Sequence, residues 1–147
     1  MKTSADYLAK GKVDSHFFVK PTLGSPEDRV AILEAILSGE KCFGFGSDSA
    51  PHRREKKESS SPPPGIYLPP DVSYGILVEL FSQSGGDWQN RLEKFACRNA
   101  ENFYRLKPTK QKIKLVKVNW QVLSETSDVP VVPFAAGETL HWRPFIS

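Results

Sequence analysis

The chain has 147 residues, which is typical of one domain, and its 39% hydrophobic and 25% charged residues predict a globular protein. A net charge of +3 is too small to predict nucleic-acid binding, and no aromatic residues are interleaved with the densest basic cluster, residues 53–57, which we interpret as a solvated loop. No apolar run approaches the roughly 18 residues of a membrane span, and residues 1–12 lack the apolar core of a signal peptide. We therefore expect a cytoplasmic protein that binds neither nucleic acid nor membranes.

The first third of the chain predicts a strand, a helix and a second strand. Residues 13–19 are largely apolar and run into Pro21, as a short buried strand does. Residues 25–37 begin with serine, proline and two acids, carry apolar residues at helical spacing, and end before Gly39. Residues 42–46 are again apolar and predict the second strand. This order is that of a βαβ unit, whose strands should be parallel.

The rest of the chain predicts two helices and a strand. The helices are expected at about 73–84 and from Asp87, which can cap the second one, to about Phe103. Residues 110–122 alternate between apolar and polar side chains, as a strand near a surface does. Residues 129–134 carry two prolines and are expected at a sheet edge or in an extended segment.

Candidate chemistry centres on Asp48 and His52, which lie in a polar, turn-rich segment just after the predicted strand at 42–46. An aspartate at the end of a barrel strand can bind a metal through one oxygen and accept a proton on the other. Spacing alone does not establish this role. The proline-rich stretch at 53–71 is either a disordered linker or a loop folded over an active-site mouth.

The remaining histidines and the cysteines are expected to be structural. His16 lies in an apolar run and predicts a core residue, whereas His141 is expected to be structural or exposed. Cys42 and Cys97 form no CxxC pair, so we expect two reduced core thiols. The chain has no HxH pair, no HExxH, no GxSxG and no phosphate-binding loop, so other classes of site find no support.

Residues 46–52, Gly-Ser-Asp-Ser-Ala-Pro-His, followed by residues 57–59, Lys-Glu-Ser, resemble the aspartate-bearing signature of dihydroorotase, a member of the amidohydrolase superfamily. Residues 16–21 and 25–29 resemble the penultimate barrel strand of that family and the start of the helix after it. The likeness is to the single-function dihydroorotases of bacteria and fungi.

Two further stretches extend this resemblance to nearly the whole chain. Residues 99–106 resemble the helix end that the family writes as Asn-x-x-x-x-Tyr/Phe-Gly-Leu, and residues 132–139 with Trp142 resemble its C-terminal tail. The resemblance implies an α/β fold in which residues 1–147 form the C-terminal portion of a TIM-type (β/α)8 barrel. Only the last two barrel strands, their helices and the tail would be present, so this barrel is expected to be incomplete.

The resemblance also implies a reaction and a set of roles. The family interconverts L-dihydroorotate and N-carbamoyl-L-aspartate in pyrimidine synthesis at two zinc ions. Asp48 matches a zinc ligand that also carries the proton between the bridging hydroxide and the leaving nitrogen, and His52 matches the residue that holds the carboxylate of the substrate. The backbone carbonyl of Lys20 and the backbone N–H of Gly65 match contacts to the substrate ring. Pro64 departs from the pattern, because the family has a free N–H there.

The other zinc-binding groups of the family, namely an HxH pair, a carbamylated lysine and two more histidines, lie upstream of the matched region. One carboxylate cannot hold two zinc ions, so this chain is not expected to bind zinc fully. A barrel without six of its strands also has an open edge, through which chains could self-associate. Two functions remain open: a dihydroorotase-like enzyme whose activity needs the upstream part, and a non-catalytic remnant that acts as an interaction or structural protein. Whether the chain alone is an enzyme is undecided.

Overall fold

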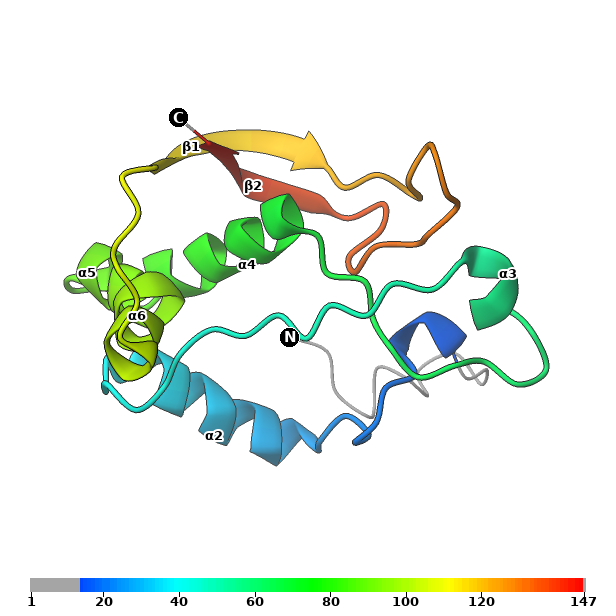
Figure 1. Cartoon of the computed structure of the whole chain (residues 1–147), viewed down its shortest axis with the longest axis horizontal. Coiled ribbons are helices and arrows are strands. Elements are labelled where there is room, and N and C mark those ends of the chain that lie inside the picture. Colours follow the sequence, from blue (N-terminus) through cyan, green and yellow to red (C-terminus); the bar gives the residue numbers. More distant parts are fainter. Residues whose placement is uncertain (1–13, 147) are drawn as a thin grey trace. The chain divides into compact units, whose positions relative to one another are not determined.

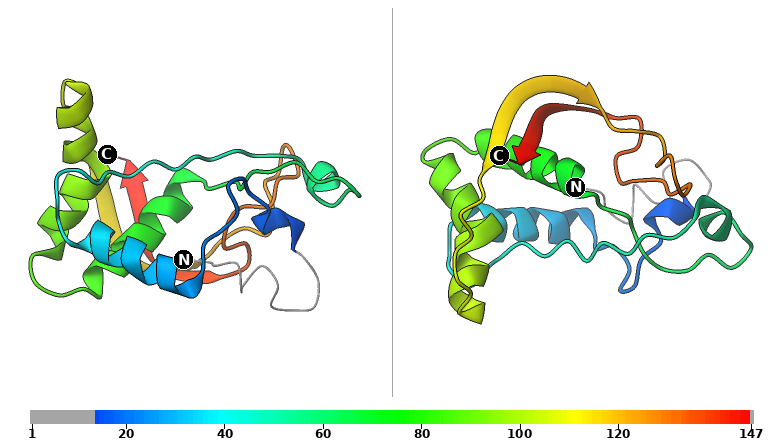
Figure 2. Two further views of the ribbon diagram at one scale, coloured as in Figure 1. Left: turned by 90° about the horizontal axis from the view of Figure 1, so that it is seen from below. Right: turned by 45° about the horizontal axis from the view of Figure 1, so that its top comes forward.

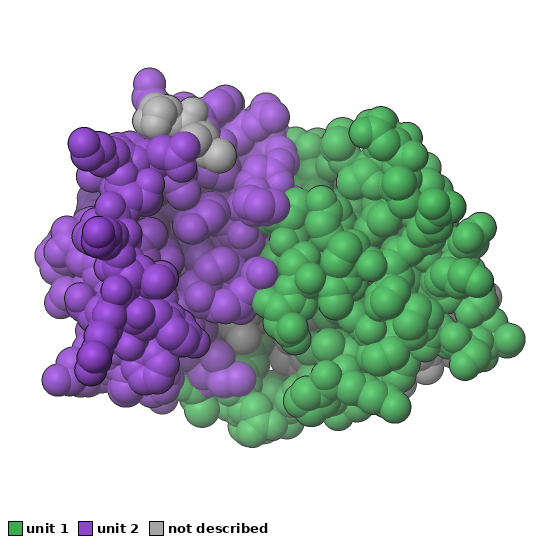
Figure 3. Space-filling model, viewed as in Figure 1, with its two compact units in different colours: residues 1–31, 48–69, 121–138 green, residues 32–47, 70–120, 139–147 purple. Residues whose placement is uncertain are grey.

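The computed structural model describes residues 14–146, and Figure 1 shows its helices and strands. In chain order the elements are η1 (Ser15–Phe17), α2 (Pro26–Leu37), α3 (Arg54–Lys57), α4 (Pro70–Ser82), α5 (Trp88–Glu93), the π-helical turn η2 (Lys94–Arg98), α6 (Asn99–Tyr104), β1 (Ile113–Gln121) and β2 (Thr139–Ile146). The chain forms two compact units (Figure 3): residues 1–31, 48–69 and 121–138, and residues 32–47, 70–120 and 139–147.

The helix predicted after the first apolar run is confirmed as α2. Its first turn is closed by a reciprocal pair of hydrogen bonds, because the Asp28 N–H donates to the Ser25 hydroxyl (3.2 Å) and the Ser25 N–H donates to the Asp28 carboxylate (2.8 Å). The helix ends before Gly39, whose φ of 80° is accessible to glycine without strain. Near its C-terminus, Ile36 and Leu37 pack against the core of the second unit.

The two predicted barrel strands are not strands in this structure. Position 13 lies outside the described residues, and residues 15–17 form the 3-10 turn η1. Residues 42–46 pair with no strand; instead the Phe45 N–H donates to the Phe95 carbonyl (2.9 Å) and the Asn99 amide donates to the Phe43 carbonyl (2.7 Å). A barrel strand is defined by hydrogen bonds to neighbouring strands, and none of the strands among residues 14–146 lies beside these segments.

The second unit is built around α4, which packs against β2. The strand predicted at 110–122 is confirmed as β1, and it pairs with β2 in a two-stranded sheet whose strands run in opposite directions (Figure 2). The approach of helix to sheet is close, because a Cβ at Gly75 would lie 2.9 Å from the Trp142 carbonyl oxygen. The buried core residues of this unit are Leu77, Val78, Phe81, Leu92 and Phe95.

The helix predicted from Asp87 is observed as three consecutive segments, α5, η2 and α6. The Asp87 side chain does not cap it, contrary to the prediction; its backbone carbonyl accepts the Arg91 N–H instead (3.2 Å). At the other end, Arg105 adopts a left-handed conformation with φ 55°, and the Leu106 N–H reaches the Glu101 carbonyl (2.9 Å). This is the Schellman geometry that usually has glycine at the left-handed position.

Several expectations about single residues need correction. Cys42 and Cys97 are free thiols, as expected, but both are exposed and neither lies in the core. His16 is half-buried beside Glu58, and therefore is not an apolar core residue, whereas His141 is exposed as expected. Among the described residues, no helix combines the length and the apolar character that a membrane crossing requires.

Candidate active site

Asp48 and His52 both belong to the first unit and lie in the segment that the sequence singled out. Asp48 has a φ of 43°, in the left-handed region that aspartate tolerates better than most residues do. Its side chain is exposed, and among residues 14–146 it belongs to no group of three side chains that could hold a metal ion. The acid is therefore accessible to a substrate or to a metal ion.

His52 is half-buried and is held by a backbone group. Its Nε2 atom lies 3.1 Å from the carbonyl oxygen of Pro64. A carbonyl can only accept a hydrogen bond, so Nε2 must carry the proton in this contact. The ring is thus oriented by the loop that follows it.

Residues 58–66 form a folded loop that packs against the segment carrying the two candidate residues. The Ala50 N–H donates to the Ile66 carbonyl (3.0 Å), and the Leu68 N–H donates to the Ser49 hydroxyl (3.0 Å). Gly65 has a φ of 145°, and a Cβ there would lie 2.6 Å from the Ala50 carbonyl oxygen. The sequence of residues 53–71 allows two interpretations, a disordered linker or a loop over an active site. The structure contains a folded loop beside Asp48 and His52, so the disordered linker is wrong.

The two predicted backbone contacts lie in the same unit. Lys20 is exposed and precedes Pro21 through a cis peptide bond. The Gly65 N–H donates to the Phe18 carbonyl at 2.9 Å. A ligand that uses this N–H must therefore replace that hydrogen bond.

Lys57 is the residue that sequence reasoning missed, because it lies in a charged cluster that we interpreted as solvated. Its side chain is buried, with 3% exposure, and Nζ donates to three backbone carbonyls, those of Phe18 (3.1 Å), Pro63 (3.0 Å) and Gly65 (2.8 Å). Burial lowers the pKa of the Lys57 ammonium, and the nearby negative charge of Asp14 opposes this shift. The available signal was its place after the 46–52 motif.

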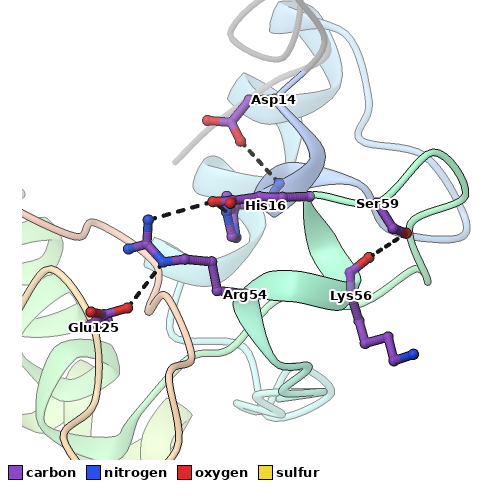
Figure 4. Close-up of polar contacts among 7 residues, drawn as sticks. Asp14, His16, Arg54, Lys56, Ser59 and Glu125 are labelled. Atoms are coloured by element: carbon purple, nitrogen blue, oxygen red, sulfur yellow. Dashed lines mark hydrogen bonds and ion pairs between the residues drawn. The ribbon is translucent and has the colours of Figure 1, made fainter.

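Arg54 of α3 lies at the centre of a small network of ion pairs (Figure 4). Arg54 contacts Glu58 at 3.5 Å and Glu125 at 3.0 Å, and Glu58 also lies 3.1 Å from the Nε2 atom of His16. The Arg54 N–H donates to the Pro130 carbonyl (2.7 Å). Exposed ion pairs of this kind contribute about 0–1 kcal/mol each, so the network supports the loop only modestly.

The C-terminal tail segment joins the same unit. Residues 129–134, predicted at a sheet edge or in an extended segment, include the isolated parallel bridge between Tyr67 and Pro133; residue 129 is a bend, and residue 134 begins a turn. The Phe134 N–H donates to the Tyr67 carbonyl (2.7 Å), and the Phe134 ring meets the Phe17 ring edge to face with centroids 5.9 Å apart. The tail therefore fixes the far end of the loop that begins at α3.

The described residues do not by themselves fit a two-metal site. No group of three histidine, cysteine, aspartate or glutamate side chains that could hold a metal ion occurs among residues 14–146. Asp48 therefore has no set of further ligands beside it within these residues, and His52 already donates to a carbonyl. A zinc ion needs about four ligands, so zinc binding at this site would require groups from outside the described residues.

Comparison with known proteins places this geometry in a family, although no family model matches the chain. The chain is 38% identical over 140 residues to the mitochondrial dihydroorotase of Arabidopsis thaliana, covering 93% of this chain and 36% of that protein. It is also 38% identical over 136 residues to the dihydroorotase of Azoarcus sp. (strain BH72), covering 90% of this chain and 39% of that protein.

Solved structures give the same result. The dihydroorotase of Saccharomyces cerevisiae in complex with 5-fluoroorotic acid superposes with a TM-score of 0.89 at 26% identity, covering 100% of this chain and 41% of that one. The dihydroorotase of Campylobacter jejuni gives a TM-score of 0.83 at 34% identity, covering 99% and 42%. The fold is therefore that of part of a TIM-type amidohydrolase barrel. The chain belongs to the dihydroorotase family and corresponds to its C-terminal part, spanning 36–42% of the length of these four proteins.

Proposed function

We propose that this chain supplies the proton-transfer and substrate-carboxylate part of a dihydroorotase-like hydrolase, which interconverts L-dihydroorotate and N-carbamoyl-L-aspartate. The observation that carries the proposal is the joint placement of Asp48 and His52 on one segment, with the loop at 58–66 packed against it. The fold shared with dihydroorotases supports the same reaction class. The chain alone is proposed to be inactive, because it offers one acidic ligand where the family has two zinc ions.

The roles follow from the chemistry of the side chains. The exposed carboxylate of Asp48 can accept a proton and deliver it to the leaving ring nitrogen. Because Nε2–H of His52 donates to the Pro64 carbonyl, the imidazole would hold the carboxylate of the substrate through Nδ1–H, which requires a proton on both ring nitrogens. The carbonyl of Lys20 and the N–H of Gly65 are proposed ring contacts, and the second requires release of the Phe18 carbonyl.

The alternative is a non-catalytic interaction protein, which one feature favours. Several large apolar side chains are exposed in the second unit, and they include Phe103 (78% exposed), Tyr104 (68%) and Leu106 (58%). Contiguous exposed apolar residues promote association between chains. Sedimentation of the purified chain over a concentration series measures this association.

As for location, we propose the cytoplasm, and imaging of a tagged chain tests this against the mitochondrial location named for the plant relatives.

A chimaera tests the enzymatic proposal directly. The chain replaces the matched residues of the Azoarcus dihydroorotase, and the ring-opened product is measured by chromatography. We expect turnover in the chimaera and its loss in Asp48→Asn, because the amide neither ligates as an anion nor carries the proton. Asp128→Asn, which changes another exposed aspartate, is the matched control and should leave turnover unchanged. Equal turnover in Asp48→Asn would refute the role of Asp48.

A further inference from the structure

The ammonium group of Lys57 is fully used inside the first unit. Nζ has three hydrogens, and the three carbonyls of Phe18, Pro63 and Gly65 lie 2.8–3.1 Å away. The Phe18 ring also faces the ammonium, with its centroid 5.9 Å from Nζ. Every donor of this buried cation therefore has an acceptor, which a buried ammonium requires.

These three carbonyls belong to two segments that lie far apart in the sequence. Phe18 lies two residues before Lys20, and Pro63 and Gly65 flank Pro64, whose carbonyl receives the hydrogen bond of His52. The Gly65 N–H also donates to the Phe18 carbonyl, so the two segments are joined both directly and through the lysine. The loop cannot shift along His52 without breaking contacts to Nζ.

We propose that Lys57 is a positioning residue of this site, holding the 63–65 loop so that the Pro64 carbonyl orients the imidazole of His52. The inference rests on the proposed function for its catalytic meaning, because the role of His52 toward substrate is itself proposed. The geometric part stands on the contacts of Nζ alone. Removal of the ammonium leaves three carbonyls without their donor, and each lost hydrogen bond makes the position of the 63–65 loop less stable.

The neighbouring lysine provides a matched control. Lys56 belongs to the same short helix, α3, and is exposed, so Lys56→Met makes the same chemical change without removing a buried donor. In ¹⁵N-labelled full chain we expect Lys57→Met to accelerate hydrogen exchange at the Ala50 and Gly65 amides at least tenfold, while the amides of α4 and β1 keep their rates. Lys56→Met should change neither set.

The tautomer of the His52 ring is a second measurement, because a general loss of stability would not by itself change which ring nitrogen carries the proton. We expect ¹⁵N spectra of the wild-type chain to show the Nε2–H form, and those of Lys57→Met to show a mixture of tautomers. Lys57→Arg, which keeps a charged donor, should restore most of the Nε2–H signal. Unchanged exchange and an unchanged His52 signal in Lys57→Met would overturn the proposal, as would equal acceleration in both units.

If Lys57→Met does not fold, hydrogen exchange in the wild-type chain still tests the proposal. The buried, hydrogen-bonded ammonium hydrogens on Lys57 should exchange at least tenfold more slowly than those on Lys56, and equal rates would refute the proposal. In the chimaera, Lys57→Met should raise KM at least tenfold with a smaller change in kcat. If the wild-type chimaera is inactive, the proposed function fails, whereas the exchange results still decide the role of Lys57.

Discussion

The Nε2 atom of His52 lies 3.1 Å from the carbonyl oxygen of Pro64, so the loop that lacks a backbone donor at this position supplies an acceptor to the histidine instead. Proline removes an N–H but keeps its carbonyl, and it also restricts its own φ. If the family has a free N–H at this position, as the resemblance implies, Pro64 cannot make that ligand contact, but its carbonyl still supports His52.

Replacement of His52 by alanine should weaken substrate binding more than it changes the chemical step. A hydrogen bond to a charged group is worth about 1.5–3 kcal/mol, so KM in the active chimaera should rise roughly ten- to a hundredfold. Steady-state kinetics with L-dihydroorotate measure this. A KM equal to that of the parent chimaera would contradict the role assigned to His52.

Replacement of Gly65 by alanine should destabilise the first unit. The new Cβ would lie 2.6 Å from the Ala50 carbonyl and 3.0 Å from Cδ2 of His52, at a φ of 145°. Strain and overlap together should lower the free energy of unfolding by about 2–4 kcal/mol, which urea denaturation measures. Gly46→Ala is the control, because nothing lies within 4 Å of its Cβ position. Equal effects of the two substitutions would show that Gly65 is not closely packed.

Replacement of Arg105 by glycine should stabilise the end of α6. The left-handed conformation of Arg105, with φ 55° and ψ 40°, costs a non-glycine residue about 1–2 kcal/mol, and the greater flexibility of unfolded glycine offsets part of this. We expect a net gain of about 0.5–1 kcal/mol, seen as a higher melting temperature. Arg98→Gly, at a helical position with φ −62°, should lower the melting temperature; a loss in Arg105→Gly as well would disprove the strain.

The lowered pKa of Lys57 predicts that the contribution of this residue to the free energy of unfolding increases at alkaline pH. The folded chain releases this proton at a lower pH than the unfolded chain, whose lysine keeps the ordinary pKa of 10.5. Below both values the burial of the charge opposes folding in full; between them the unfolded state binds more protons, so the free energy of unfolding increases with pH. The free energy of unfolding of the wild type minus that of Lys57→Met, measured by urea denaturation in this alkaline window, should therefore increase with pH. A difference that shrinks would show that the pKa is raised.

The purified chain should hold fewer than one zinc ion per chain after dialysis, since no three metal-ligating side chains gather among residues 14–146. Elemental analysis by mass spectrometry measures this, with Asp48→Ala as the matched variant. Stoichiometric zinc that Asp48→Ala removes would overturn the expectation and would show that additional ligands come from residues 1–13 or from a second chain.

Much of this molecule follows from local sequence. Residues 25–37 encode α2 through their own caps and spacing, and residues 110–122 encode β1 through alternation; both elements are observed close to the predicted bounds. The turn after residues 42–46 also marks Asp48 and His52, because polar residues interrupt an apolar run there. These features depend on contacts within a few residues along the chain, so the sequence pattern contains the information.

Only the tertiary structure decided the rest. Residues 42–46 are as apolar as a barrel strand, but a strand exists only where a neighbouring strand accepts its hydrogen bonds, and the Phe95 carbonyl and the Asn99 side chain take that place here. Lys57 lies in a charged run that predicts exposure, and its burial depends on carbonyls 39, 6 and 8 residues away. Burial of a charge is decided by partners that the fold brings together, and no pattern within the run itself reveals them.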